Sequence, residues 1–134
     1  MVGEVDLDRL LAAMKPVLQD GEFVFSSITS KPFSELDELR PLACYHEAEG
    51  LSLLLEKSVA QQHDLEHTAV FRCITLSVHS SLDAVGLTAA VASKLAANDI
   101  PANVIAAFYH DHVFVPKESA EQALCLLQEF ESSD

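Results

Sequence analysis

Residues 74–116 read ITLSVHSSLDAVGLTAAVASKLAANDIPANVIAAFYHDHVFVP, and the pattern of this stretch decides the fold. It begins inside an alternating run in which Ile74 and Leu76 are apolar while Thr75 is polar. Such alternation predicts a strand over residues 68–78, with one buried face and one wetter face.

The strand is followed by a helix and a hairpin. After a polar turn, Leu87, Val91 and Leu95 recur at the spacing of one helical face. Two short apolar runs at residues 102–110 and 112–115 then predict two strands that pair with each other.

The last periodic segment, KESAEQALCLLQEF at residues 117–130, predicts a closing helix. Glu118 and Glu121 suit the positive N-terminal end of that helix. Its inward face is expected to carry Ala120, Ala123, Leu124, Leu127 and Phe130. Residues 68–130 therefore predict the order β-α-β-β-α, which is the split βαβ, ferredoxin-like plan without its fourth strand. We expect the N-terminal half to supply that strand.

The N-terminal half begins with DLDRLLAAMKPVL at residues 6–18, which predicts an amphipathic helix capped by Asp6 and ended or kinked by Pro16. Its apolar face is expected to carry Leu7, Leu10, Leu11, Met14 and Leu18. A strand, a long polar loop, two strands joined at Glu49-Gly50 and a short helix follow over residues 22–29, 30–41, 42–57 and 58–63. We expect two related units, a degenerate one over residues 1–66 and a complete one over 67–134.

Composition limits the classes of partner. The chain has 134 residues and a formal net charge of −13, with 21 acidic residues against 8 Lys and Arg. Such a charge repels phosphate backbones and anionic headgroups, which argues against nucleic acid and membrane partners. No run approaches the roughly 18 apolar residues of a membrane span, and the N-terminus is acidic where a signal peptide is basic. We expect a soluble cytoplasmic protein in which Cys44, Cys73 and Cys125 are buried, reduced thiols.

The turn LDAVGL at residues 82–87 and the strand entry at residues 100–104 resemble those of the ACT domain, a small ligand-binding module of amino-acid metabolism. FVFSSITSKPFSEL at residues 23–36 and EAEGLSLLLEK at residues 47–57 resemble the N-terminal part of stand-alone ACT-domain proteins. The likeness covers most of the chain. It implies an α+β, ferredoxin-like βαββαβ fold, an antiparallel sheet with helices on one face, built as two ACT-like units that share strands.

The sequence departs from the family pattern at two places. Val85 stands where a proline commonly precedes the turn glycine, and Asn98-Asp99 replaces the glycine that commonly ends the first helix. Asn and Asp tolerate the left-handed conformation better than other residues with a side chain, so we expect the bend after the helix to be kept.

In the family the ligand, often a free amino acid, lies against this turn at an interface between two domains. A helix N-terminus there offers unpaired N–H groups to a carboxylate, and Gly86 lets the backbone approach the ligand. Ser81 or Asp83 could instead simply cap the helix, a role that does not exclude binding. The resemblance implies a ligand site formed by His79, Ser80, Ser81, Leu82, Asp83, Val85, Gly86, Leu87, Asn103, Val104 and Ile105. Asn103 is expected to face the turn.

Two histidine groups have a spacing that could serve a metal site. His63 and His67 have the spacing of a helical zinc site, but Asp64 stands where the zinc motif needs Glu, so we favour a solvated connection. His110 and His112 flank Asp111, where we expect a hairpin turn that separates their side chains. A subunit contact or pH-sensitive contact remains an alternative for that pair, since His titrates near neutrality.

No nucleophile motif, phosphate loop or nucleotide fingerprint is found, so no catalytic residue, metal or cofactor is expected. We therefore expect a regulatory or sensory module that binds an amino acid or related metabolite, and not an enzyme. A protein-interaction module without a ligand is the alternative, and a metal enzyme using His79, His110 and His112 is a third hypothesis. Unpaired strand edges favour self-association, most simply as a homodimer.

Overall fold

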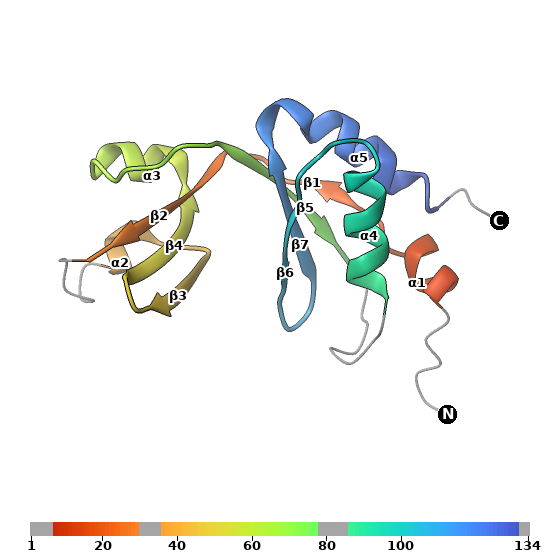
Figure 1. Cartoon of the computed structure of the whole chain (residues 1–134), viewed down its shortest axis with the longest axis horizontal. Coiled ribbons are helices and arrows are strands. Elements are labelled where there is room, and N and C mark those ends of the chain that lie inside the picture. The colour runs from red at the N-terminus through yellow and green to blue at the C-terminus, as the bar shows by residue number, and fades with distance from the viewer. Residues whose placement is uncertain (1–6, 30–35, 78–85, 132–134) are drawn as a thin grey trace. The chain divides into compact units, whose positions relative to one another are not determined.

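The computed structural model describes residues 7–29, 36–77 and 86–131. The predicted N-cap Asp6 lies outside them. Helices and antiparallel strands alternate as the α+β prediction requires, and the helices pack on the sheet as expected for tandem ferredoxin-like units (Figure 1). Within the described ranges, no helix combines the length and the apolar character needed to cross a membrane.

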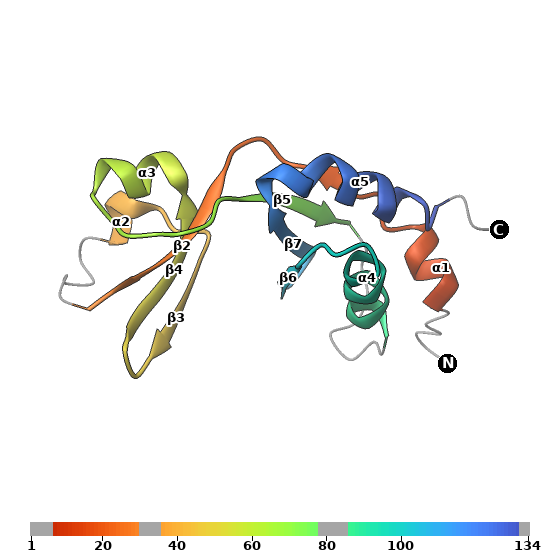
Figure 2. The same cartoon turned by 45° about the horizontal axis from the view of Figure 1, so that its top comes forward.

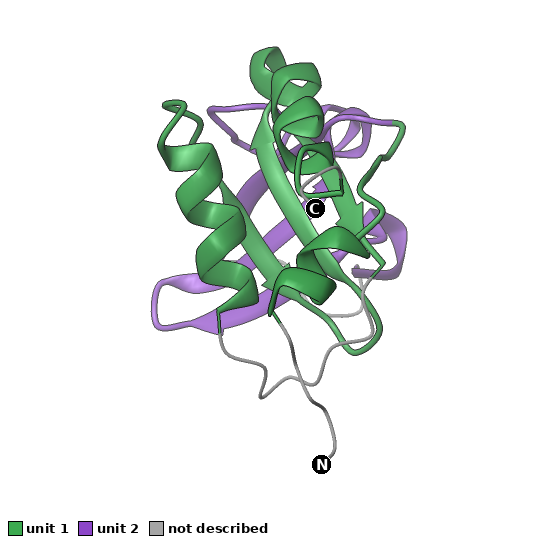
Figure 3. Ribbon diagram, turned by 90° about the vertical axis from the view of Figure 1, so that its right-hand side faces the viewer, with its two compact units in different colours: residues 1–20, 72–134 green, residues 21–71 purple. Residues whose placement is uncertain are grey.

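The chain divides into two compact units (Figure 3). Unit 1 comprises residues 1–20 and 72–134, and unit 2 comprises residues 21–71. Residues 7–20 therefore pack with the C-terminal half. The predicted boundary between residues 66 and 67 separates two related units of sequence, which differ from the two compact units of the folded chain. It stays a prediction.

Unit 1 holds four strands in the order β1-β5-β7-β6. β1 pairs antiparallel with β5, with Leu18 opposite Ile74, so the N-terminal segment supplies the missing fourth strand. The expectation that Leu18 continues the first helix was wrong, because the helix stops four residues before Pro16. The elements of this unit are α1 (Leu7–Ala12), β1 (Val17–Leu18), β5 (Phe71–Leu76), α4 (Leu87–Ala96), β6 (Asn103–Ala106), β7 (Asp111–Pro116), the 3-10 helix η2 (Lys117–Ser119) and α5 (Ala120–Gln128).

The core of unit 1 lies between the sheet and its helices (Figures 1 and 2). Leu87, Val91 and Leu95 of α4 are all buried, as the spacing predicted. Met14, which follows α1, is fully buried in the same cluster. The remaining buried members are Leu11, Ile74, Leu76, Ile100, Val113, Val115, Ala120, Ala123 and Leu127.

The opposite face of β5 is not the wetter face that the alternation suggested. Cys73 and Thr75 are both buried, and so is Phe114 of β7. The polar side chain of Thr75 is accommodated there because its hydroxyl lies 3.0 Å from Nδ1 of His112. The three cysteines are free, but only Cys73 is buried; Cys44 lies on an exposed edge strand and Cys125 on the outer side of α5, so burial was wrongly predicted for both.

The bend after α4 has the conformation that the sequence suggested. Asp99 adopts a left-handed φ of 60°. The N–H of Ile100 donates to the carbonyl of Leu95 at 3.0 Å, and the Asn98 side chain donates to the carbonyl of Lys94 at 3.0 Å. These bonds satisfy carbonyl groups at the end of the helix, so no glycine is required.

The hairpin of β6 and β7 turns earlier than predicted. The N–H of Ala107 donates to the carbonyl of His110 at 2.9 Å, so Phe108 and Tyr109 form the tip. Asp111 is the first residue of β7, opposite Ala106, and not the turn residue. The turn was misplaced because an apolar Phe-Tyr pair is not a usual turn signal.

Unit 2 holds a three-stranded antiparallel sheet in the order β3-β4-β2. Val24, Leu53 and Leu55 of this sheet pack with Leu39 and Ala60 from its two helices. The four-residue helix α2 lies inside the stretch that was predicted to be a loop. The elements are β2 (Phe23–Ile28), α2 (Leu36–Leu39), β3 (Ala43–Glu47), β4 (Gly50–Glu56) and α3 (Lys57–Gln62).

The segment after α3 runs beside β2 without forming a strand ladder. Only Phe71 pairs with Phe23, and its ring meets the ring of Phe25 edge-on at 5.4 Å between centroids. The predicted strand over residues 68–78 therefore begins three residues late, and in unit 2 residues 65–70 occupy the fourth-strand position in irregular form.

Candidate ligand-binding site

Part of the predicted ligand site lies in the described residues of unit 1. Gly86 and Leu87 begin α4, while Asn103, Val104 and Ile105 belong to the edge strand β6. The other predicted members lie outside the described residues: His79, Ser80, Ser81, Leu82, Asp83 and Val85.

Gly86 has the geometry of a glycine that its turn requires. It is the N-cap of α4 and has a φ of 100°, which residues with a side chain rarely adopt. A Cβ at this position would also lie 3.2 Å from Cδ2 of Leu7. Glycine itself supplies no side-chain acceptor, so the first N–H groups of α4 are not capped by this residue.

The side chains of the described site residues differ in what they can contact. Leu87 is buried and Val104 packs against the same core, so these two residues could offer a ligand little beyond their backbone. Asn103 is exposed, with a free amide for hydrogen bonding, and Ile105 is half-buried opposite His112.

The structure separates Gly86 from Asn103 within one chain. α4 has ten residues, and only residues 97–102 connect its end to Asn103. A helix of that length spans about 15 Å, so the two residues lie toward opposite ends of α4. The start of α4 lies at the same end of unit 1 as the tip of the β6–β7 hairpin (Figure 1). Gly86 and Asn103 are therefore not brought together within a single copy, and the expectation that Asn103 faces the turn stays a prediction.

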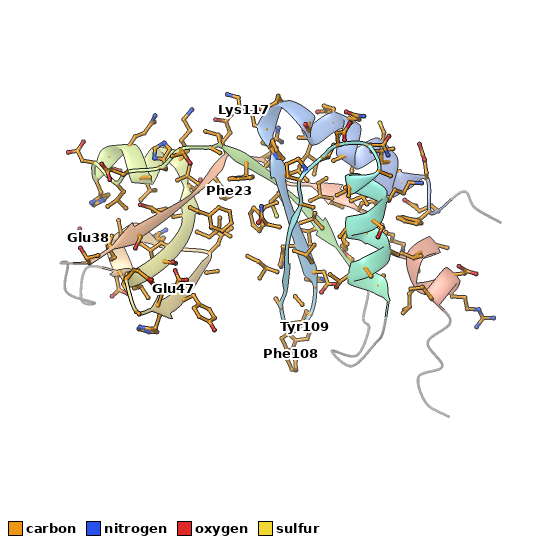
Figure 4. All side chains as sticks on the ribbon, viewed as in Figure 1. Phe23, Glu38, Glu47, Phe108, Tyr109 and Lys117 are labelled. Atoms are coloured by element: carbon orange, nitrogen blue, oxygen red, sulfur yellow. The ribbon has the colours of Figure 1, made fainter. Side chains whose placement is uncertain are left out.

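The histidines of the hairpin form a second cluster of polar side chains. The rings of His110 and His112 lie 6.3 Å apart, so the expected separation by a turn at Asp111 was wrong. Beyond His110 the aromatic contacts continue through Tyr109 to Phe108, with centroid separations of 6.4 and 4.9 Å. Phe108 and Tyr109 project from the tip (Figure 4) and are 81% and 64% exposed.

The electrostatics of this cluster favour its neutral forms. Burial, with a smaller contribution from the charge of His110, lowers the pKa of His112 below its ordinary value, while Asp111 acts in the opposite direction. Burial also raises the pKa of Asp111. The pKa of the Cys73 thiol is raised by burial as well, against a smaller opposing effect of the hydrogen bond with Thr75. A buried thiol of raised pKa is a poor nucleophile.

Neither histidine group forms a metal centre in the part of the chain that the structure covers. No three or more His, Cys, Asp and Glu side chains converge there. Helix α3 ends at Gln62, and Nδ1 of His67 lies 3.1 Å from the carbonyl of Leu65. His63 and His67 therefore do not share one helical face.

Unit 2 carries a groove that the sequence did not indicate. It has a volume of about 700 Å³ and is open to solvent. Phe25, Ser26 and Ser27 of β2, Ser52 of β4 and the segment Glu66, His67 and Thr68 line it. The one sequence feature at this place was the pair Ser26-Ser27 inside a strand. It could not show that residues 65–70 form no strand beside β2.

Comparisons with known proteins place both halves of the chain in one family. One ACT domain family matches residues 2–72, and a second ACT domain family matches residues 68–129. The comparison with curated proteins finds no match.

Solved structures agree with this assignment. A protein of unknown function from Vibrio cholerae, described as a possible transport protein, is 51% identical, with a TM-score of 0.85 over 96% of this chain and 98% of that one. A protein from Agrobacterium tumefaciens is 20% identical, with a TM-score of 0.72 over 88% and 89%. The regulatory subunit of aspartate kinase from Thermus thermophilus, in a ligand-free form, shares the fold at 12% identity and a TM-score of 0.64, over 87% and 97%. The chain belongs to the ACT domain family.

Proposed function

We propose that this protein is a regulatory module that binds a free amino acid at the N-terminus of α4. The observation that supports the proposal is Gly86, the N-cap of α4. It is left-handed, and it has no side chain that could cap the first turn of the helix. The N–H groups of the first turn of a helix favour a carboxylate, and the helix dipole adds to the attraction. Membership of the ACT family makes a small ligand the expected occupant.

The separation of Gly86 from Asn103 suggests that the site is completed by a second copy. Asn103 lies on β6, which is the outer strand of its sheet, and one edge of β6 pairs with no strand among the residues that the structure describes. An unpaired edge favours association with another chain. In a symmetric dimer the exposed Asn103 of one copy could reach the helix start of the other, so the proposed assembly is a homodimer.

A thermal-shift screen of the proteinogenic amino acids tests the ligand. We expect one or a few of them to raise the melting temperature, because a ligand that binds only the folded state stabilises it. Asn103→Ala should weaken the binding of that ligand about tenfold or more, since one hydrogen bond to a charged group is worth roughly 1.5 kcal/mol. Gln122→Ala, at an exposed position on α5, is the matched control. If no amino acid stabilises the protein, the ligand class is wrong.

A protein-interaction module without a ligand is the second candidate. The exposed pair Phe108 and Tyr109 favours it, because two large aromatic side chains at a hairpin tip are typical of a contact surface (Figure 4). Co-purification of a partner that is lost when both residues are replaced by Ser, without any amino acid response, would support this candidate over the first.

A further inference from the structure

The groove of unit 2 follows the open edge of β2. The N–H of Lys57 donates to the carbonyl of Glu22 at 2.9 Å, which makes these two residues a hydrogen-bonded pair of the antiparallel ladder. Because such pairs alternate, the backbone groups of Phe25 and Ser27 point away from β4, toward the groove. The only strand pairing on that side of β2 in the described residues is Phe23 with Phe71.

Most of the residues that line the groove carry a hydroxyl group, and two of these hydroxyls donate their hydrogens to other groups of the protein. Ser26 donates its hydroxyl hydrogen to the backbone carbonyl of Glu66 at 2.7 Å. Ser52 donates its own to the side-chain carboxylate of Glu47 on β3. The register places Ser52 opposite Ser27, on the face of the sheet that carries Phe25, whereas Ser26 lies on the other face. A hydroxyl whose hydrogen is used in this way still presents its lone pairs, so Ser52 faces a ligand as an acceptor, and Ser26 holds Glu66 beside β2.

The imidazole of His67 presents an acceptor for the same reason. Its Nδ1 lies 3.1 Å from the carbonyl of Leu65, and a carbonyl can only accept. Nδ1 therefore carries the hydrogen, and Nε2 of the neutral ring holds a lone pair. Glu66, which also lines the groove, brings a carboxylate to the same surface.

The groove contains no basic counterpart to these acceptors. None of its described lining residues is Lys or Arg, so a carboxylate or phosphate would find no cationic partner. One wall is the ring of Phe25, which is 38% exposed and held edge-on by Phe71. An aromatic face attracts cations as well as alkyl groups.

We propose that this groove binds a small organic ammonium ion, a primary amine whose N–H groups donate to its acceptors and whose alkyl body lies on Phe25. Its volume is within the range of small-molecule sites. The site is separate from the one proposed at α4, and it does not depend on that proposal, because all of its residues belong to unit 2.

Three molecules of one size test the charge that the groove selects. Full-length protein labelled with ¹⁵N is titrated at constant ionic strength with n-butylammonium, 1-butanol and butyrate. We expect the amide signals of Ser27, Ser52 and Thr68 to shift with n-butylammonium only. An equal response to butyrate, or no response of these signals to n-butylammonium, overturns the proposal.

Two variants separate a specific site from the general attraction of an acidic protein for cations. Glu66→Gln removes a carboxylate from the groove, whereas Glu121→Gln removes one from an exposed position on α5. We expect Glu66→Gln to lower the affinity for n-butylammonium about fivefold, as for the loss of one partly exposed ion pair. Glu121→Gln should leave that affinity unchanged. Equal effects of the two variants would mean that only the overall charge attracts the amine.

L-2-Aminobutyrate distinguishes a free amine from an amino acid, since it carries the same ammonium group next to a carboxylate. Because no basic side chain lines the groove, we expect it to shift the groove signals less than n-butylammonium at equal concentration. Tighter binding of L-2-aminobutyrate would overturn the assignment to free amines. Failure of the amino acid site at α4 would leave these groove signals unaffected, so the two proposals fail separately.

Discussion

Single residues decide which substitutions can probe the proposed ligand site. Gly86 is unsuitable for this purpose, because any side chain there meets Leu7 and must adopt a φ of 100°. A variant at Gly86 would lose stability and ligand together, and the two effects could not be separated. Asn103 is exposed and supports no core contact, so its truncation reports on binding with little effect on folding.

His112 should make the stability of the protein depend on pH. Its pKa in the folded state is lowered from an ordinary value of 6.5, chiefly by burial. The unfolded chain therefore takes up a proton more readily, and folding stability is full above about pH 6.5 and falls as the pH drops through that value toward the lowered pKa. We expect urea unfolding to give a smaller free energy at pH 5.5 than at pH 7.5.

His112→Gln is the matched variant for this prediction. The amide keeps a partner for the buried hydroxyl of Thr75 but does not titrate. Its unfolding free energy should change less between the two pH values than that of the natural protein. An unchanged pH slope in the variant would assign the dependence to groups other than His112. Asp111 is not among them, because its raised pKa acts at lower pH with the opposite sign.

Some residue-level features could be predicted from the sequence and some could not. The left-handed bend at Asp99 agrees with the expectation from the family resemblance, because Asn98-Asp99 stands where the family has a glycine and both residues tolerate this conformation. The exposure of Cys44 was not foreseen. An apolar neighbourhood in the sequence does not reveal that β3 is an edge strand, and edge exposure is a property of the assembled sheet.

At the scale of elements, substitutions in residues 7–20 test whether this N-terminal segment is part of the core of unit 1. Met14 is fully buried in a cluster whose other buried members, apart from Leu11, are more than fifty positions away in sequence. We expect Met14→Ala to lower the free energy of unfolding by about 2–5 kcal/mol, the usual cost of truncating a buried side chain of this size. Urea unfolding followed by circular dichroism measures it.

Val17→Ala in the same segment serves as the control. Because Val17 is 50% exposed, its truncation should lower the free energy of unfolding by less than about 1 kcal/mol. The labelling rate of the buried thiol of Cys73 gives a second measurement, with Cys44 and Cys125 replaced by Ser. Met14→Ala should speed labelling and Val17→Ala should not. Equal effects of the two variants would mean that the segment does not form part of the core.

The order of elements could be predicted where the hydrophobic period was long, and the details failed where elements were short. The spacing of Leu87, Val91 and Leu95 specified α4 correctly. The two-residue strand β1 and the four-residue helix α2 are too short to show any period, and long-range packing fixes them. The hairpin tip was misplaced because Phe108 and Tyr109 are residue types typical of strands, although both are exposed at the turn.

The groove in unit 2 shows the same limit on sequence reasoning. Its existence depends on residues 65–70 remaining irregular beside β2, although the sequence there continues into a predicted strand. The acceptor role of Ser52 depends on its hydrogen bond to Glu47, and the position of Glu66 depends on the hydrogen bond from Ser26. Neither fact is encoded in a local pattern, so the site could be found only from the folded chain.

At the scale of the whole molecule, the net charge of −13 opposes the proposed dimer. Two copies that carry this charge repel each other at long range, and salt screens the repulsion. We therefore expect the dimer fraction in sedimentation velocity to rise when sodium chloride is increased at a fixed protein concentration. A dimer fraction that falls with salt would indicate that ion pairs between copies dominate the interface.

The same measurement links the dimer to the ligand. If the site combines the start of α4 from one copy with Asn103 from the other, an amino acid that binds there must strengthen the dimer, because ligand binding and association share one free-energy cycle. The amino acid that gives the largest thermal shift should raise the dimer fraction of the natural protein. Asn103→Ala should lose much of that response and keep the response to salt, since the variant does not alter the net charge. If the ligand instead binds without changing the dimer fraction, each site lies within a single copy, and Asn103 takes no part in it.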